Sequence, residues 1–453
     1  MKASVSVIRS PAFAPGRRIW RAPVRMWLAP VLFALVSCAT VDPFIPVDHL
    51  ADDEQFLQSA AVLEEKNKTI YREKDRVLYF LDKGMLTHHG GAWEESSALL
   101  EQGEKAIEAN FAVSVSQEIG VLLLNDRTRE YDGEDYEDLY LNVFNALNYY
   151  HRNNLEEALV EIRRMNNKLR DLSVKYGTMM TGMQKLALEN GTEIPPNPEA
   201  PSAFNNSALA RYLGILFYRG AGMMDDARID ERGLRTAMAD APSVYPNPVP
   251  ASVKDELAIP PGMARLNALG FTGRAPVKTE ETLRIFLGNA WIKIALPVMT
   301  ARPSRITSVE AVLDSGESFT LELLEDMGAV AAAAFTRKKN LIYTRSVIRA
   351  SVKGIAASAF NVAADNSTEN SGLYALLGLG SQILAEASER ADLRSSRYFP
   401  GQAYVGGINL PPGEYSFTLT FYGPGKTVIA RRRHEKVNVR ANALNLTEDI
   451  CLR

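Results

Sequence analysis

The hydrophobic pattern of the chain changes character past its middle. Over residues 52–240, apolar residues recur at spacings of three and four, as in Leu141 and Phe144, which is typical of helices that bury one face. From residue 263 to residue 453, apolar and polar residues alternate over short runs, which is typical of half-buried strands. Residues 241–262 are rich in proline and predict a linker. The pattern predicts a multidomain α+β fold with a helical domain and then a β-rich, sandwich-like domain.

Several strands and one helical insertion are predicted in the β-rich domain. Alternation is clear at Thr282–Leu287 and Trp291–Leu296. Val309–Leu313 and Phe319–Leu323 flank a polar turn, as the strands of a hairpin do. Alanine-rich and apolar stretches predict helices at about residues 329–390, and further strands follow to the end of the chain.

Three stretches of the helical domain share a pattern. In each, a small residue is followed by aromatic or polar residues and a short turn. A second small residue comes twelve or thirteen positions after the first. The paired small residues are Gly84 and Ser96, Ala146 and Ala158, and Gly214 and Ala227. Small residues let two helices pack closely, and the pattern resembles tetratricopeptide repeats, which recur about every 34 residues.

The spacing between these stretches is wider than one repeat. Gly84 and Ala146 are 62 residues apart, and Ala146 and Gly214 are 68 residues apart. Further helix pairs are therefore expected between them, for example at Val113–Leu124 and Leu172–Leu188. An irregular helical bundle is the alternative to a repeat array.

A targeting segment precedes the helical domain. Five arginines and a short apolar run at Trp27–Val36 predict a signal peptide at residues 1–37. The run is shorter than the roughly 20 residues that a membrane-spanning helix requires, and an uncleaved signal anchor is the alternative. Pro43 and Pro46 are expected to prevent a helix in residues 38–51, which would then form a tether.

The end of the apolar run, Leu35-Val36-Ser37-Cys38, resembles the lipobox of bacterial lipoproteins. The resemblance implies that the Cys38 thiol is acylated and that the chain is cut just before it, so that lipid holds the mature protein on a membrane. In the Gram-negative sorting system, an aspartate after the acylated cysteine commonly retains a lipoprotein in the inner membrane. Ala39 occupies this position, which implies the periplasmic side of the outer membrane, with the periplasmic face of the inner membrane as the alternative.

Composition excludes some classes of function. The formal net charge is -3 over 453 residues, whereas nucleic-acid-binding proteins usually show a basic excess, so no nucleic acid partner is expected. The two cysteines are Cys38 and Cys451, which leaves no pair for a disulfide once Cys38 carries lipid. Cys451 is expected to be a small buried residue of a final strand.

No motif for metal, cofactor or nucleophilic chemistry stands out. The five histidines do not form H-E-x-x-H, and the chain has no G-x-S-x-G or phosphate-loop motif. His88 and His89 are expected in a polar turn, and the basic run Arg431–His434 is expected at a solvated hairpin end. The acid-rich run Glu130–Asp138 lacks the calcium-loop pattern and is expected to stabilise the start of a helix. We therefore expect no cofactor, no metal and no enzymatic activity.

The stretch Gly372–Ala385 is apolar on nearly every side. It is too short to span a bilayer. A helix of this kind is usually buried in protein, so a core or interface helix is expected, with insertion into a membrane as the alternative.

The whole arrangement resembles a family of bacterial envelope lipoproteins. The lipobox at Cys38, the sequence Asn-Ala-Leu-Asn-Tyr-Tyr at 145–150, and the phrases Glu322–Asp326 and Ala391–Arg397 carry the resemblance. The family has no established activity to carry over. Its members are thought to be encoded near lipoproteins that activate peptidoglycan synthases, which implies a role in peptidoglycan or outer-membrane biogenesis.

The predicted function is that of a non-enzymatic scaffold or adaptor for a protein partner in the envelope. Helical repeats commonly present a groove to a partner, and Asn145, Asn148, Tyr149 and Tyr150 are the expected partner-binding residues. The alternative is a glycan-binding or glycan-processing lipoprotein, with peptidoglycan as the glycan and the site in the β-rich domain. The oligomeric state and the identity of the partner stay open.

Overall fold

The computed structural model describes residues 42–116, 127, 129–189, 191, 192, 194, 204–287, 290–365 and 390–453. The predicted signal peptide, the acylation site Cys38 and the apolar stretch Gly372–Ala385 lie outside these residues, as does most of Val113–Leu124. Pro43–Arg453 group into one unit by their contacts. Among the described helices, none combines the length and the apolar character that crossing a bilayer requires.

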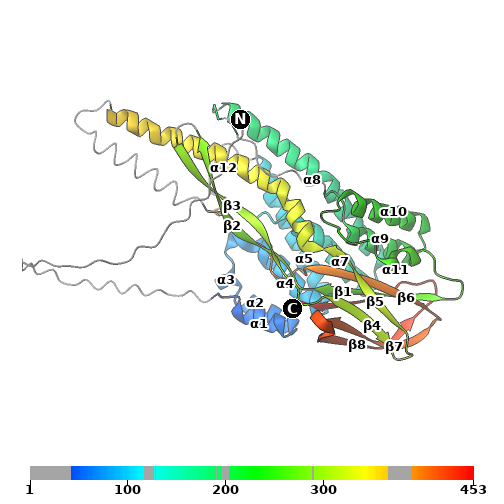
Figure 1. The fold of residues 1–453 in the computed structure, drawn as a ribbon. Coiled ribbons are helices and arrows are strands. Elements are labelled where there is room, and N and C mark those ends of the chain that lie inside the picture. Colours follow the sequence, from blue (N-terminus) through cyan, green and yellow to red (C-terminus); the bar gives the residue numbers. More distant parts are fainter. Residues whose placement is uncertain are drawn as a thin grey trace, which may run out of the picture. The chain divides into compact units, whose positions relative to one another are not determined.

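The fold is a mixture of helix and sheet, with a helical N-terminal part and a β-rich C-terminal part (Figure 1). This confirms the coarse prediction of a mixed fold, with a helical N-terminal part and a β-rich C-terminal part. The helices are α1 (Ile45–Asp52), α2 (Phe56–Glu65), α3 (Asn67–Ile70), α4 (Arg76–His89), α5 (Trp93–Ser116), α7 (Asp135–His151), α8 (Leu155–Glu189), α9 (Ala208–Gly220), α10 (Met224–Asp240), α11 (Ala251–Asp255) and α12 (Met327–Asp365). The strands are β1 (Ala264–Thr272), β2 (Arg274–Leu287), β3 (Ala290–Arg302), β4 (Ser308–Leu313), β5 (Ser318–Asp326), β6 (Gln402–Leu410), β7 (Gly413–Tyr422), β8 (Val428–Val439) and β9 (Asn445–Cys451).

The expectation that two prolines prevent a helix near the tether is wrong. Helix α1 begins at Ile45, with proline in its first turn. A proline there costs little, because the first amides of a helix have no carbonyl partner within the helix and the fixed φ of proline suits it.

Three helical hairpins, α4–α5, α7–α8 and α9–α10, are joined by turns of one conformation. Each turn has three residues, and its middle residue, Gly91, Asn153 or Gly222, has a positive φ of 78°, 58° or 76°. The amide of this residue donates to the carbonyl three positions earlier at 2.8–3.0 Å. A left-handed residue commonly ends a helix, and glycine and asparagine adopt this conformation at the lowest cost. The three hairpins are therefore structurally equivalent at their turns.

Small residues lie where the helices of the hairpins approach each other. A Cβ atom added to Gly84 would lie 2.9 Å from the side chain of Leu100, and one added to Gly214 would lie 1.9 Å from that of Asp230. The expectation of an additional helix pair at Leu172–Leu188 is wrong. This stretch continues α8, whose 35 residues account for much of the wide spacing before the third hairpin.

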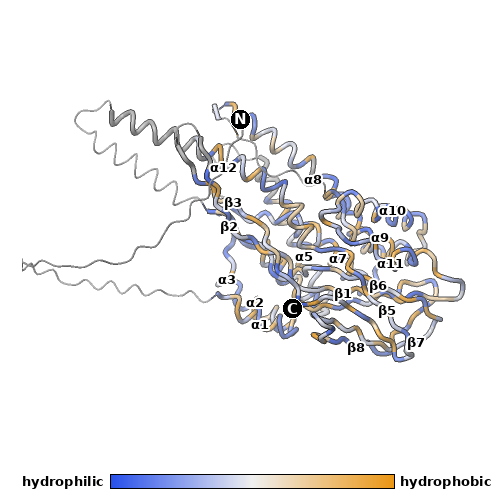
Figure 2. The backbone as a smooth tube through the Cα atoms, in the orientation of Figure 1, coloured by the Kyte–Doolittle hydropathy of each residue, from blue (hydrophilic) through white to orange (hydrophobic). Residues whose placement is uncertain are grey.

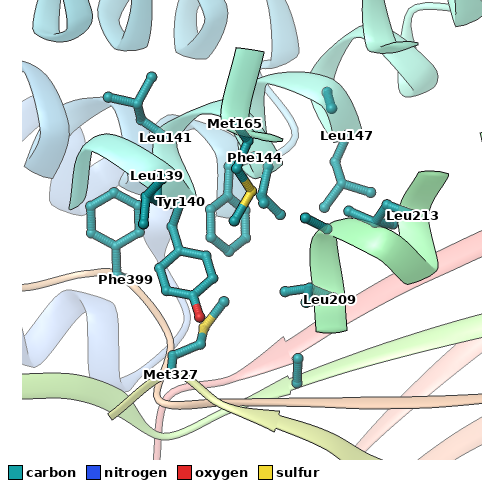
Figure 3. Packing of buried hydrophobic residues seen from close by; sticks show 14 of the residues in the cluster. Leu139, Tyr140, Leu141, Phe144, Leu147, Met165, Leu209, Leu213, Met327 and Phe399 are labelled. Atoms are coloured by element: carbon teal, nitrogen blue, oxygen red, sulfur yellow. The ribbon is translucent and has the colours of Figure 1, made fainter. Parts of the chain in front are cut away.

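Helix α7 is at the centre of the largest hydrophobic core. A capping box between Glu134 and Glu137 begins the helix, which confirms the role predicted for Glu130–Asp138. Hydrophobic and hydrophilic residues are interspersed along the helices (Figure 2), and their apolar sides meet at α7. The residues that pack there include Leu139, Tyr140, Leu141, Phe144, Leu147, Met165, Leu209, Leu213, Met327 and Phe399 (Figure 3). The core thus joins α7 to α8, α9, α12 and the segment before β6.

The main sheet has seven strands in the order β8-β7-β4-β5-β6-β1-β9. All neighbouring pairs are antiparallel except β1 and β9, which are parallel. The two edge strands approach each other: the Arg432 guanidinium of β8 donates to the Ile450 carbonyl of β9 at 2.9 Å, and His434 Nε2 lies 2.6 Å from Asp449 Oδ2. The sheet is therefore curled. Strands β2 and β3 form a separate two-stranded sheet.

Most predicted strands are confirmed, and one local expectation is wrong. Thr282–Leu287 and Trp291–Leu296 lie in β2 and β3, and β4 and β5 form the predicted hairpin. The predicted helical insertion follows β5 as α12, which is 39 residues long. Cys451 is the buried last residue of β9, as expected. The basic run Arg431–His434 is not at a hairpin end, because it lies in the middle of the 12-residue strand β8.

A buried carboxylate fastens α7 and α9 to the sheet. Glu325 of β5 is 1% exposed and accepts hydrogen bonds from the Tyr140 hydroxyl at 2.6 Å, the Tyr245 hydroxyl at 2.7 Å and the Ser207 hydroxyl at 2.9 Å. The amide of Leu209 donates to it at 3.2 Å. The carboxylate thus gives each of four buried donors an acceptor at the boundary between helices and sheet.

A second carboxylate, Glu137, fastens the start of α7 to the segment before β6. Glu137 is fully buried. It accepts from the Ser396 amide at 2.6 Å, the Tyr131 hydroxyl at 2.7 Å and the Glu134 amide at 2.9 Å. Burial, together with the charge of Glu134, raises the pKa of Glu137 to about 7.

Candidate functional site

The four residues predicted to bind a partner lie on α7 but line no open groove. Asn145 and Asn148 are buried, and Tyr149 and Tyr150 are half-buried. The Tyr149 hydroxyl donates to Glu101 of α5 at 2.9 Å. These side chains therefore contact the protein itself.

The sheet covers the inner face of the hairpins. The ring of Phe144 on α7 lies 5.1 Å from that of Phe271 on β1, and Tyr140 reaches Glu325 of β5. Arg219 of α9 donates to Asn267 of β1 at 2.7 Å. The surface on which a groove was expected is thus occupied by the protein's own strands.

A cleft of about 500 Å³ opens where the start of α2, the turn after α4 and strands β8 and β9 meet. We call it the junction cleft. A cleft of this volume accommodates a small ligand or a short segment of a larger one. Its lining residues are Glu54, Gln55, Phe56, Leu57, Gln58, His88, His89, Gly90, Trp93, Arg432, Glu448, Asp449 and Ile450.

Glu448 of β9 is the polar centre of the junction cleft. Its Oε1 lies 2.6 Å from His88 Nε2, and its Oε2 lies 3.1 Å from His151 Nε2. Its side chain is only 8% exposed. Burial raises the pKa of the Glu448 carboxyl, but the charge of His88 and the hydrogen bonds from His151 and His88 outweigh burial and hold this pKa well below its usual range. One ionised carboxylate is therefore shared by imidazoles from α4 and α7.

The His88 ring is held by a chain of hydrogen bonds that continues through α7 and α5. His88 Nδ1 lies 2.7 Å from Asn148 Oδ1, while the amide nitrogen of Asn148 donates to Ser96 Oγ at 2.8 Å and Ser96 Oγ donates to the Gly84 carbonyl at 2.8 Å. Both ring nitrogens of His88 therefore face hydrogen-bonding oxygens, and His88 is held between Asn148 of α7 and Glu448 of β9. It lies in the last turn of α4, where the helix dipole favours a positive charge.

His89, the next residue, is neutral. Its Nε2 donates to the Tyr398 carbonyl at 3.0 Å. Burial and the neighbouring His88 lower the pKa of His89 to about 3. The expectation that His88 and His89 form a polar turn is therefore wrong, because both end a helix and contact residues of the C-terminal part.

Two further ion pairs include residues of the cleft lining. Arg432 of β8 lies 2.6 Å from Glu54, and His434 of β8 lies 2.6 Å from Asp449 of β9. Burial raises the pKa of Asp449, and the hydrogen bond from His434 opposes this rise. Acidic and basic side chains therefore lie in fixed positions in and next to this part of the lining.

Aromatic and apolar side chains complete the lining. The Trp93 ring stacks on His151 with centroids 4.2 Å apart and an angle of 14° between planes. Phe56 is buried in the wall, whereas Leu57 is 49% exposed. The cleft thus combines a fixed aromatic ring with hydrogen-bonding groups, which suits binding of a polar ligand.

A second, smaller cavity of about 50 Å³ lies between α12, β3 and the segment before α7. Its two lysines are paired within its wall, with Lys278 Nζ 2.6 Å from Glu134 and Lys338 Nζ 3.2 Å from Asp132. The junction cleft, at about 500 Å³, is far larger and is the better candidate site.

The junction cleft could not be found from motif spacing. His88 and Glu448 are 360 residues apart in the chain, and the cleft forms only when α2, the turn after α4 and strands β8 and β9 come together. One signal was present: His88 continues the apolar side of α4 formed by Leu81 and Met85, and a histidine on a buried face requires polar partners.

Within the described residues, no three or more histidine, cysteine, aspartate or glutamate side chains are placed to hold a metal ion. Comparison of the chain with models of protein families, with curated proteins and with solved structures finds no match. We therefore infer function from the geometry of the junction cleft.

Proposed function

We propose that the protein is a lipid-anchored adaptor of the cell envelope that holds a periplasmic partner in the junction cleft without catalysing a reaction. The observation that carries this proposal is the cleft itself, in which Glu448, His88 and Trp93 line open space and are held in place by contacts with one another and with His151. The anchor is proposed from sequence, through acylation of Cys38, and Ala39 supports the outer membrane.

The hairpins support a relationship to tetratricopeptide repeats. Their turns share length, hydrogen bonds and a left-handed middle residue, and equivalent helix pairs packed side by side are the signature of such arrays. Because the sheet covers the inner face of the hairpins, we place the partner in the junction cleft and not at Asn145 and its neighbours.

A binding role also fits the hydrogen bonds around the Glu448 network, behind the lining of the cleft. The Ser96 hydroxyl donates to the Gly84 carbonyl and not to a histidine, so no base activates it as a nucleophile. Each imidazole of the Glu448 network is engaged with that carboxylate.

Site-specific photo-crosslinking in intact cells tests the proposal. A photo-reactive amino acid replaces Leu57, which lines the cleft and is 49% exposed, and the matched control replaces Ile229 of α10, which is 53% exposed. We expect a crosslinked envelope component from position 57 and not from position 229. Equal capture at both positions, or none at position 57, would contradict the proposal.

A further inference from the structure

We infer that the ligand of the junction cleft is a short saccharide. This inference rests on the proposed function, because it takes the cleft to be the binding site and specifies the chemistry of its occupant. Three features of the cleft carry it: balanced charge, a fixed aromatic ring and a strand edge that is already hydrogen-bonded.

The charges of the cleft are paired locally. Arg432 is paired with Glu54, Asp449 with His434, and Glu448 with His88 and His151. Such a site has little net attraction for an ionic ligand, yet it offers many fixed hydrogen-bonding groups. A sugar hydroxyl donates and accepts at once, so it matches a surface where carboxylate acceptors and nitrogen donors lie close together.

One carboxylate of the lining is hydrogen-bonded through only one of its two oxygens within the described part of the chain. Asp449 Oδ2 is engaged with His434, and no described residue donates a hydrogen bond to Asp449 Oδ1. His434 already holds the carboxylate in place. Binding of a sugar hydroxyl to Oδ1 therefore costs little side-chain entropy. The exposed amides of Gln55 and Gln58 at the rim add groups that both donate and accept.

Trp93 provides the apolar contact that a sugar ring needs. Its stacking on His151 fixes the plane of the indole, and its edge-on contact with His88, 5.4 Å between centroids, holds the ring from a second direction. The C–H groups on one face of a pyranose ring form an apolar surface that packs against an aromatic face.

An extended peptide, the other candidate occupant, fits less well. Peptides commonly bind by adding a strand to a free sheet edge, and β9 is such an edge. However, the Tyr150 hydroxyl accepts from the Leu446 amide at 3.0 Å and lies 3.3 Å from the Leu446 carbonyl, and Arg432 donates to the Ile450 carbonyl. Side chains of the protein thus already occupy three of the backbone groups along this edge, so a peptide strand could pair with it only in part.

Calorimetric titration of the purified lipoprotein in a zwitterionic, sugar-free detergent tests the inference. The probes are linear tetrasaccharides of glucose and of N-acetylglucosamine. We expect saturable binding of at least one of them, with affinity at least tenfold lower in Asp449→Asn and in Trp93→Leu. The matched control is Asp314→Asn, which removes an ion pair with Arg433 on the same sheet outside the cleft and should leave affinity unchanged.

Each outcome bears on one proposal or on both. Binding that falls only in the cleft variants supports the inference, and a circular dichroism spectrum of each variant shows whether it is folded. If neither sugar binds, or if both cleft variants bind as the wild type does, the inference is wrong. Crosslinking from position 57 to a protein, without sugar binding, would overturn the saccharide and leave the proposed adaptor function standing. No specific crosslink at position 57 would overturn the adaptor.

Discussion

Glu325 and Glu448 are both buried carboxylates at the boundary between helices and sheet, yet their surroundings differ. Glu325 is enclosed by neutral donors from Tyr140, Tyr245 and Ser207, and its whole hydrogen-bonding capacity serves the fold. Glu448 is shared by two imidazoles beside an open cleft. The difference indicates that an enclosed carboxylate with neutral partners fastens the structure, whereas a carboxylate with titratable partners beside open space is suited to bind a ligand.

The largest effect is expected from removal of the enclosed carboxylate. Glu325→Ala leaves four buried donors without an acceptor and should lower the free energy of unfolding by about 3 kcal/mol or more. Urea unfolding followed by circular dichroism measures this. Glu317→Ala, an exposed glutamate in the turn before β5, should change little. A loss below about 1 kcal/mol in Glu325→Ala would remove the distinction between the two carboxylates.

The pH dependence of stability tests the second enclosed carboxylate, Glu137. Its pKa is about 7 in the folded protein against an ordinary value of 4.5, so the folded state keeps a proton that the unfolded state loses. Its contribution to stability should therefore be greatest below pH 4.5 and fall by about 3 kcal/mol as the pH rises from 4.5 to 7, with no further loss above.

The control for this pH dependence is Glu137→Gln. The difference in unfolding free energy between wild type and variant, measured by urea unfolding from pH 4.5 to pH 8, isolates Glu137 from groups that titrate in the same range, such as His89. We expect the wild type to lose unfolding free energy relative to Glu137→Gln as the pH rises. A constant difference would contradict the pKa assigned to Glu137.

A smaller loss of unfolding free energy is expected from removal of the Tyr150 hydroxyl, which contacts the edge of β9. Tyr150→Phe removes the hydrogen bonds to Leu446 of β9 and should cost about 1 kcal/mol of unfolding free energy. Tyr149→Phe, which removes the bond of a half-exposed tyrosine to Glu101, should cost less. Equal losses, measured by chemical denaturation, would show that the edge of β9 does not depend on Tyr150.

The smallest effect on stability is expected inside the junction cleft. Asp449→Asn keeps the shape of the side chain and should cost about 1 kcal/mol or less, yet it should at least halve the yield of the crosslink from position 57. A thermal melt and a crosslinking assay on the same variant measure both quantities. Loss of stability without loss of crosslinking would make Asp449 a structural residue, like Glu325.

The sequence predicts elements well where a single periodicity governs them. The helices around Phe144, the β4–β5 hairpin and the buried Cys451 follow from local pattern, because one face of each element is buried and the other is not. Strand β1 escapes prediction because all nine of its residues are buried, so no alternation marks it. The basic run in β8 misleads for the opposite reason, since exposed charges on an edge strand resemble a loop.

The site is harder to predict than the fold. Its residues come from the ends of elements that are far apart in the chain, and local pattern carries no information on which ends meet. Asn148 and Tyr150 were singled out from sequence, and both contact the network or the edge of β9. Neither residue lines the cleft, however. The residues that do, such as Trp93 and Asp449, come from other segments of the chain.

Hydrogen–deuterium exchange of the purified lipoprotein, with and without the solubilised envelope fraction of its host, tests the central claim most directly. The account predicts slower exchange in β9 at Asn445–Cys451 and in the turn between α4 and α5, with no change on the outer faces of α8 and α10. Protection confined to those outer helices, with β9 unchanged, would contradict the assignment of the junction cleft as the binding site.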